Sequence, residues 1–106
     1  MDDCIFCKII KEEIPTKIEK ETKNLVVFRD IKPQASIHLL IVPKKHSKDI
    51  TEIDDNIWVE IKNTAIDLAK ENKLAGFRLV NNTGKAALSS HMHVHFLGEV
   101  SIDRKI

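Results

Sequence analysis

The sequence predicts an α+β fold in which helices pack against an antiparallel sheet. Its apolar patterns run in the order helix, strands, helix, strands, and this order disfavours the strict strand–helix alternation of a doubly wound parallel sheet. A length of 106 residues, of which 42% are hydrophobic and 31% charged, suits a globular unit that buries a core of its own. We therefore expect one domain over residues 1–106.

The first element is expected to be a short helix from Asp3 to Lys11. Asp2 or Asp3 is placed to cap its start, and Pro15 prevents it from continuing. The apolar residues of this segment recur at helical spacing, namely Ile5, Phe6, Ile9 and Ile10.

Three strands are expected in the rest of the first half. Lys17 to Glu21 shows the short alternation of an edge strand, and Leu25 to Asp30 is rich in valine and phenylalanine. Ile37 to Val42 is the most hydrophobic of the three, and Pro43 ends it.

The second half opens with a long amphipathic helix that Thr51 or Asp54 can cap. Gly76 suits the left-handed conformation beyond the end of this helix. Strands are expected at Phe77–Val80 and His91–Leu97, with a turn at Asn81–Gly84. The expected apolar stripe of the helix consists of Ile57, Ile61, Ala65, Leu68 and Ala69, widened by Trp58 and Ile66.

Charge and hydropathy exclude several classes of function. Seventeen basic and sixteen acidic side chains leave a net charge of +1, which argues against broad electrostatic binding to nucleic acid but leaves room for a small phosphate-bearing ligand. No run approaches the about 18 apolar residues of a membrane span. The acidic start is not typical of a secretory signal, and two cysteines suggest a reducing compartment, so we expect a cytoplasmic protein without a membrane partner.

The strongest chemical signal is the sequence His91-Met92-His93-Val94-His95. In an extended strand the three histidines point to one face, and the apolar residues between them point to the core. The outer two lie about 13 Å apart at the backbone, so one straight strand cannot easily bring all three rings to one metal ion. We therefore expect the three histidines to divide their roles.

The second signal is the pair Cys4 and Cys7. Two thiolates three residues apart can chelate one zinc ion, which then needs two further ligands. Candidates for these ligands are His46 and one end of the histidine cluster, since the chain has no other cysteine. Two buried free thiols or a redox pair are the alternatives, although a redox pair normally lies at a strand-to-helix turn of a βαβ unit.

Four segments in order carry a family resemblance: CIFCKII-x-x-EIP, FRDI-x-PQA-x-IH-x-L-x-VPKKH, GFR-x-V-x-N-x-G and HMHVHFLG. Together they resemble the histidine triad (HIT) family, and specifically its branch of histidine-triad nucleotide-binding proteins. The resemblance implies an α+β fold with a five-stranded antiparallel sheet and two helices. It also implies a homodimer whose two sheets join across a two-fold axis.

The resemblance further implies hydrolysis of nucleoside phosphoramidates, of the adenosine 5′-phosphoramidate type, through a nucleotidyl-histidine intermediate. His93 matches the nucleophile, and a backbone carbonyl is expected to hold its second nitrogen. His95 matches the histidine that contacts the phosphate or the leaving group, and His38 matches a supporting histidine. Ser89 or Ser90 is a candidate to assist the leaving group, because Leu88 stands where relatives carry a serine.

The same resemblance implies a site for an AMP-like purine nucleotide and a structural zinc ion. Asp30 matches the carboxylate that binds the ribose hydroxyls, and Asn82 matches the asparagine near the phosphate. The apolar walls around the base match Ile5, Phe6, Ile9 and Phe28. The zinc ligands of related proteins match Cys4, Cys7, His46 and His91.

The loop before the histidines departs from the family pattern. It reads Gly84-Lys85-Ala86-Ala87-Leu88-Ser89-Ser90, about two residues short, with Ala87 in place of the usual glutamine. That loop normally offers donors to the phosphate, so its departure leaves the choice of substrate open and favours a non-catalytic role among the alternatives. Three alternatives to the phosphoramidate hydrolase stay open. They are a dinucleoside polyphosphate hydrolase, a non-catalytic nucleotide-binding or partner-binding dimer, and a thiol redox protein.

Overall fold

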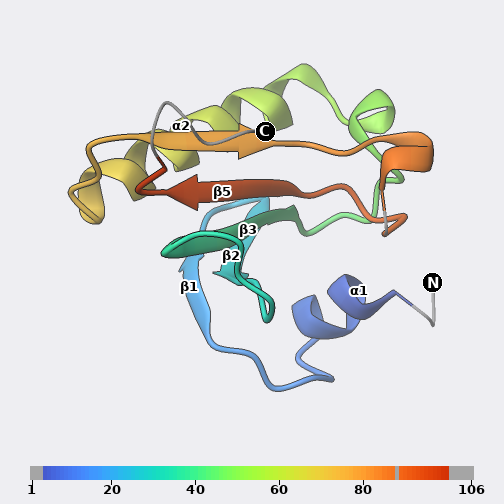
Figure 1. Cartoon of the computed structure of the whole chain (residues 1–106). Helices are drawn as coiled ribbons and strands as arrows, with labels where there is room; N and C mark the ends of the chain where they lie inside the picture. Colours follow the sequence, from blue (N-terminus) through green and yellow to red (C-terminus); the bar gives the residue numbers. More distant parts are fainter. Residues whose placement is uncertain (1–3, 88, 101–106) are drawn as a thin grey trace.

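The fold is a five-stranded antiparallel sheet with the strand order β1-β2-β3-β5-β4, seen in the computed structural model of the chain (Figure 1). The structure describes residues 4–87 and 89–100. Two α-helices pack against the sheet, so the predicted α+β class is confirmed. The strands are β1 (Ile18–Glu21), β2 (Leu25–Arg29), β3 (Ile37–Pro43), β4 (Phe77–Val80) and β5 (Val94–Gly98), and the helices are α1 (Ile5–Ile10) and α2 (Asp55–Glu71).

The sheet is covered on both faces, which gives the molecule three layers. Helix α2 lies over one face and α1 over part of the other (Figure 1). Because side chains alternate along a strand, β2 and β3 contribute to both layers and read as almost continuous hydrophobic runs. Under α2 lie Leu25, Val27, Leu39, Ile41, Val94 and Phe96, while the face toward α1 holds Val26, Phe28, Leu40 and Val42.

Helix α1 is shorter than predicted. It begins at Ile5 and ends at Ile10, and its N-cap is Cys4, whose Sγ accepts a hydrogen bond from the backbone N–H of Cys7. The predicted caps Asp2 and Asp3 lie outside the described residues. A sulfur atom thus takes the position at which Ser, Thr, Asp or Asn is usual.

Helix α2 confirms most of the predicted stripe but corrects its width. Ile61, Ala65 and Leu68 are buried, whereas Trp58 and Ile66 are exposed and do not widen the core face. The buried fourth position is Thr64, which the hydrophobic pattern missed. Asp54 is the N-cap, but its side chain makes no capping hydrogen bond, and the other predicted cap, Thr51, belongs to the short 3₁₀ helix η1 (Ile50–Glu52).

The end of α2 also differs from the prediction. Lys73, with φ of 53°, adopts the left-handed conformation that was expected of Gly76. The backbone N–H of Lys73 donates to the carbonyl of Lys70, and that of Leu74 donates to the carbonyl of Ala69. These two bonds form a Schellman motif. In this motif the residue directly after the C-cap adopts the left-handed conformation, and here that residue is Lys73 although it is not a glycine.

A carboxylate of α2 fixes the turn between β1 and β2. Glu60 accepts hydrogen bonds from the Thr22 hydroxyl at 2.5 Å and from the backbone and side-chain N–H groups of Asn24 at 2.9 and 2.8 Å. Burial raises the pKa of the Glu60 carboxyl, but these hydrogen bonds outweigh burial and hold the pKa below its ordinary value. The stabilisation is therefore present above the ordinary glutamate pKa of about 4.3 and is lost as the pH falls below it.

We expect Glu60→Ala to lower the free energy of unfolding by about 1–3 kcal/mol at neutral pH, since it leaves three donors without their acceptor. The matched control is Glu71→Ala on the same helix. Glu71 makes an exposed ion pair with Lys20, so its loss is expected to cost less than about 1 kcal/mol. Urea unfolding of both variants measures the difference, and equal costs would contradict the assigned role of Glu60.

Among the described residues, no helix combines the length and the apolar character that crossing a membrane requires.

Candidate functional site

The histidine segment enters the sheet later than predicted. Strand β5 begins at Val94, so only His95 of the three histidines lies in a regular strand. The alternation of faces nevertheless extends back through the segment. Met92 and Val94 belong to the core under α2, whereas His91 and His93 contact Phe6 of α1. The backbone N–H of Met92 donates to the carbonyl of Ser47, which replaces a strand pairing at this point.

A hydrogen bond to the backbone fixes which ring nitrogen of His93 carries the proton. Its Nδ1–H donates to the backbone carbonyl of His91 at 2.9 Å, because a carbonyl oxygen can only accept. In the neutral ring the lone pair therefore lies on Nε2. The ring of Phe6 meets that of His93 edge-on, with centroids 5.1 Å apart, and His93 is only 8% exposed. The contact to a backbone carbonyl is the one that the family resemblance implied.

His38, His95 and Asp30 form a second group on the same face of the sheet. His38 Nε2 lies 2.8 Å from His95 Nδ1 and 3.4 Å from Asp30 Oδ2. The other nitrogen of His38, Nδ1, accepts the backbone N–H of Gln34 at 2.9 Å. Burial lowers the pKa of His95, and the neighbouring His93 and His38 lower it further, against the opposing effect of Asp30. His95 is therefore neutral near pH 7.

Cys4, Cys7, His46 and His91 form a third group, with their ligand atoms within 4.8 Å of one another. The structure thus brings together the four residues expected to bind zinc, from α1, the chain after β3 and the segment before β5. His91 and His95 lie in separate groups, an arrangement that allows the three histidines to have the different roles expected of them.

The distances in this third group suit a tetrahedral ion. The Sγ atoms of Cys4 and Cys7 lie 3.2 and 3.5 Å from His91 Nδ1, and Cys7 Sγ lies 3.2 Å from His46 Nδ1. Zinc bonds of about 2.3 Å to sulfur and 2.0 Å to nitrogen, at tetrahedral angles, place sulfur and nitrogen about 3.5 Å apart. Two sulfur and two imidazole ligands are also a donor set typical of structural zinc.

The protonation of this third group agrees with metal binding. His91 donates its Nε2–H to the carbonyl of Pro43 at 2.8 Å, so Nδ1 directs its lone pair to the two sulfurs. Burial, with the neighbouring His46 and His93, lowers the pKa of His91 despite the bond to Pro43, which favours the neutral ring at pH 7. Burial and the adjacent Cys4 raise the pKa of Cys7, an effect that a bound cation reverses.

The apolar residues expected to surround a nucleoside lie on α1 and β2. Phe6, Ile9 and Phe28 are buried in one cluster, with the Phe6 and Phe28 rings 5.8 Å apart. Ile5 lies at the start of α1 and is half exposed. Asp30, just beyond β2, uses Oδ1 to accept the backbone N–H of Lys32. A carboxylate offers about four acceptor positions, so Asp30 keeps capacity for the hydroxyls of a ligand.

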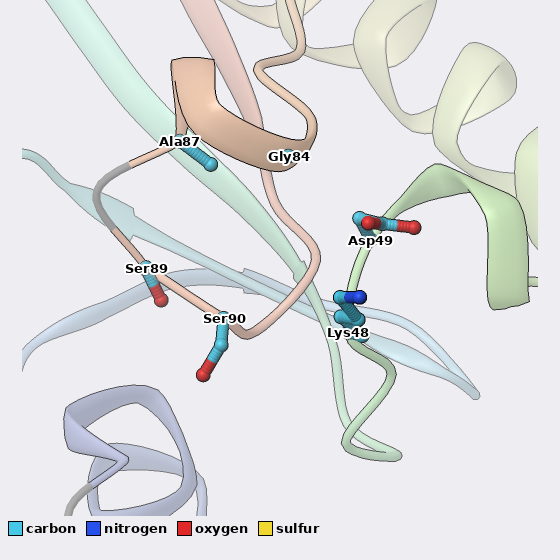
Figure 2. Close-up of a pocket in the computed structure, with 6 residues that line it drawn as sticks. All are labelled: Lys48, Asp49, Gly84, Ala87, Ser89 and Ser90. Carbon is cyan, nitrogen blue, oxygen red and sulfur yellow. The ribbon is translucent and has the colours of Figure 1, made fainter.

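The loop before the histidines, residues 84–90, borders a cavity of about 180 Å³, shown in Figure 2. The Ser89 and Ser90 side chains lie on the loop, across from the segment that carries Lys48 and Asp49 (Figure 2). Ser89 Oγ accepts the backbone N–H of His91 at 3.1 Å, which leaves its hydroxyl hydrogen available to a ligand. Asn82 is partly buried in the loop between β4 and the 3₁₀ helix η2 (Gly84–Ala86), and Leu88 lies outside the described residues.

Three contributors to the site carried no recognised signal. Asn81 Nδ2 donates to the carbonyl of His93 at 3.0 Å and so supports the backbone of the histidine segment. The position of Asn81 at the exit of a hydrophobic strand is the only sequence feature that relates to this role. The carbonyl of Pro43 and the backbone N–H of Gln34 are main-chain groups, so their roles cannot be predicted from the type of residue.

Comparisons with known proteins agree on one family. The family model described as "Scavenger mRNA decapping enzyme C-term binding" matches residues 3–104. An uncharacterized HIT-like protein of Methanocaldococcus jannaschii is 40% identical over 97 residues, which are 88% of this chain and 74% of the relative. The adenosine 5′-monophosphoramidase of Saccharomyces cerevisiae is 44% identical over 93 residues, 88% of this chain but 59% of the yeast protein.

Solved structures extend the likeness to the fold. A HIT family hydrolase from Clostridium thermocellum superposes with a TM-score of 0.90 at 37% identity, over 100% of this chain and 98% of that chain. A zinc-bound histidine triad family protein from Mycobacterium smegmatis superposes with a TM-score of 0.85 at 25% identity, over 97% and 79% of the two chains. The family model, the relatives and the solved structures agree with the arrangement of the histidines, and the chain belongs to the histidine triad (HIT) family.

Proposed function

We propose that this chain is a nucleotide-binding hydrolase that cleaves nucleoside phosphoramidates of the adenosine 5′-phosphoramidate type. The observation that carries the proposal is the geometry of His93. Its Nδ1–H is held by a backbone carbonyl and its Nε2 lone pair is available, with His95 beside it at 5.0 Å between ring centroids. The likeness to the yeast adenosine 5′-monophosphoramidase supports this substrate class.

The reaction proceeds in two displacements at the α-phosphorus. His93 Nε2 attacks phosphorus, the P–N bond of the substrate breaks, and the leaving amine takes a proton relayed from solvent through the Ser89 hydroxyl. Water then attacks the nucleotidyl-histidine. The bond from phosphorus to His93 Nε2 breaks, one proton of the water returns to solvent, and AMP and neutral His93 result.

Binding residues place phosphorus in line with His93. Asp30 accepts the ribose hydroxyls, and the base lies between Ile5, Phe6, Ile9 and Phe28. Asn82 and His95 contact the phosphate, while His38 supports His95. The proposed zinc ion, held by Cys4, Cys7, His46 and His91, is structural, because four protein ligands leave no open position for substrate.

A substrate panel tests the proposal. We expect purified protein to release AMP and amine from adenosine 5′-phosphoramidate, with a transient AMP adduct of the protein seen by mass spectrometry after acid-free quenching. Preferential cleavage of a dinucleoside polyphosphate would favour the alternative hydrolase. Tight AMP binding without turnover of any adenylyl compound would favour a binding module whose shortened loop has lost catalysis.

We also propose that the chain pairs as a two-fold homodimer through β4. This strand lies at one edge of the sheet, and Phe77 and Leu79 on it are 37% and 39% exposed. Val59 and Ile66 of α2 are exposed apolar residues as well. An uncovered edge strand with apolar side chains favours pairing with a second copy, and two-fold pairing is the commonest closed solution.

We expect Leu79→Lys to shift the protein from dimer to monomer, because a charged side chain on an edge strand opposes strand pairing. Ile31→Lys is the matched control, since Ile31 is 90% exposed but lies in the loop after β2, away from β4. Sedimentation velocity at micromolar concentrations measures both variants. A wild-type protein that is monomeric under these conditions would overturn the proposed pairing.

A further inference from the structure

We infer that the backbone N–H of Gln34 sets the tautomers of both His38 and His95. Through His38 it fixes His95 in the tautomer that presents an N–H to the phosphate. The motif Pro33-Gln34-Ala35 lies between β2 and β3, and its side-chain types suggested no role in the site. Its contribution comes from the main chain.

The first step concerns His38. Gln34 N lies 2.9 Å from His38 Nδ1, and an amide N–H can only donate, so Nδ1 must offer its lone pair. A proton on Nδ1 would put two hydrogens between these nitrogens. His38 is only 4% exposed, so water cannot easily replace the Gln34 N–H as the hydrogen-bond partner of Nδ1. The proton of the neutral ring therefore lies on Nε2.

The second step passes the constraint to His95. His38 Nε2–H has two acceptors within reach, His95 Nδ1 at 2.8 Å and Asp30 Oδ2 at 3.4 Å. The shorter contact makes His95 Nδ1 the acceptor, and the carboxylate reinforces the proton on His38 Nε2 electrostatically. With Nδ1 of His95 accepting, the proton of His95 lies on Nε2.

The third step is the consequence for a ligand. His95 then offers an N–H donor where a phosphate oxygen would bind, while His93 beside it offers a lone pair. The opposite tautomer of His95 would direct a lone pair at a phosphate oxygen, which repels it. This consequence rests on the proposed function, whereas the proton positions are a property of the protein without ligand.

The same constraint argues against a metal ion in this group. Asp30, His38 and His95 place one carboxylate and two imidazole ligand atoms within 4.8 Å, a donor set that transition metals accept. A metal on His38 Nε2 would need a neutral ring protonated at Nδ1, directly opposed by the Gln34 N–H. One main-chain hydrogen bond thereby distinguishes the two clusters of possible metal ligands found among residues 4–87 and 89–100.

The test is nitrogen NMR of ¹⁵N-labelled protein as purified, without nucleotide, at about pH 8, well above the ordinary histidine pKa of about 6.5. Long-range ¹H–¹⁵N spectra are expected to show His38 and His95 both protonated at Nε2 and unprotonated at Nδ1. Couplings across the hydrogen bonds from Gln34 N to His38 Nδ1 and from His38 Nε2 to His95 Nδ1 are expected as well. A proton on His38 Nδ1, or a metal on His38 Nε2, would overturn the inference.

Two variants separate the main-chain N–H from the side chain of the same residue. Gln34→Pro removes the donor, and Gln34→Ala keeps it, so only the alanine variant should retain the wild-type nitrogen pattern. If phosphoramidate hydrolysis is measurable, the proline variant should turn over at least about tenfold more slowly than the alanine variant, as a wrong histidine tautomer slows catalysis. The NMR result stands without activity, so an inert protein with the expected nitrogen pattern would refute the proposed function alone.

Discussion

Replacing His93 by alanine is expected to slow hydrolysis of adenosine 5′-phosphoramidate by about 10³-fold or more, since it removes the attacking atom. The loss should fall on kcat, because Asp30 and the apolar residues of α1 and β2 stay in place to bind the nucleotide. AMP affinity, measured by calorimetry, is expected to change little. Mass spectrometry of the quenched variant should show no nucleotidyl adduct.

The contrasting variant is Asp30→Ala, which keeps the nucleophile and removes the carboxylate proposed to bind the ribose. We expect it mainly to weaken nucleotide affinity, so the two variants separate chemistry from binding. His93→Gly leaves a space beside Phe6, in which free imidazole is expected to restore weak turnover. Hydrolysis by His93→Ala at the wild-type rate would contradict the assignment of the nucleophile.

Removing zinc is expected to lower the melting temperature by at least about 10 °C, which corresponds to a few kcal/mol for a domain of this size. Helix α1 has only six residues, too few to be stable alone, and the proposed ion ties it to His46 and His91, distant in sequence. Elemental analysis of untagged protein should give about one zinc per chain. Calorimetry with and without a chelator measures the stabilisation.

The double variant Cys4→Ser with Cys7→Ser is the control for the chelator. It should melt at a lower temperature than the wild type and no longer respond to the chelator. Protein purified without zinc, or a wild-type melting temperature unchanged by chelation, would contradict a structural zinc ion. A melting temperature that responds to thiol oxidation but not to chelation would favour the redox alternative.

Periodicity located the secondary structure well wherever one physical pattern dominated. The hydrophobic runs of β2 and β3 and the stripe of α2 were predicted nearly as they occur, because burial alone dictates them. The errors lie at ends and edges. The start of β5, the cap of α1 and the left-handed residue after α2 depend on hydrogen bonds with distant or main-chain partners. The predicted stripe of α2 was also too wide, since Trp58 and Ile66 are exposed.

The sequence by itself determined the α+β class, the motifs of the HIT family and the residue types of the site. It also determined that one strand could not bring three histidines to a single ion, since strand rise sets their separation. The residues alone left open which end of the histidine cluster joins the cysteines, and the family resemblance implied His91. The tertiary structure places His91 there and His95 with His38, because this depends on segments brought together across the sheet. The tautomers depend on it as well, since they follow from the carbonyls of His91 and Pro43 and the N–H of Gln34. Every residue carries such a carbonyl and every residue but proline such an N–H, so only folding sets which of them meets a histidine.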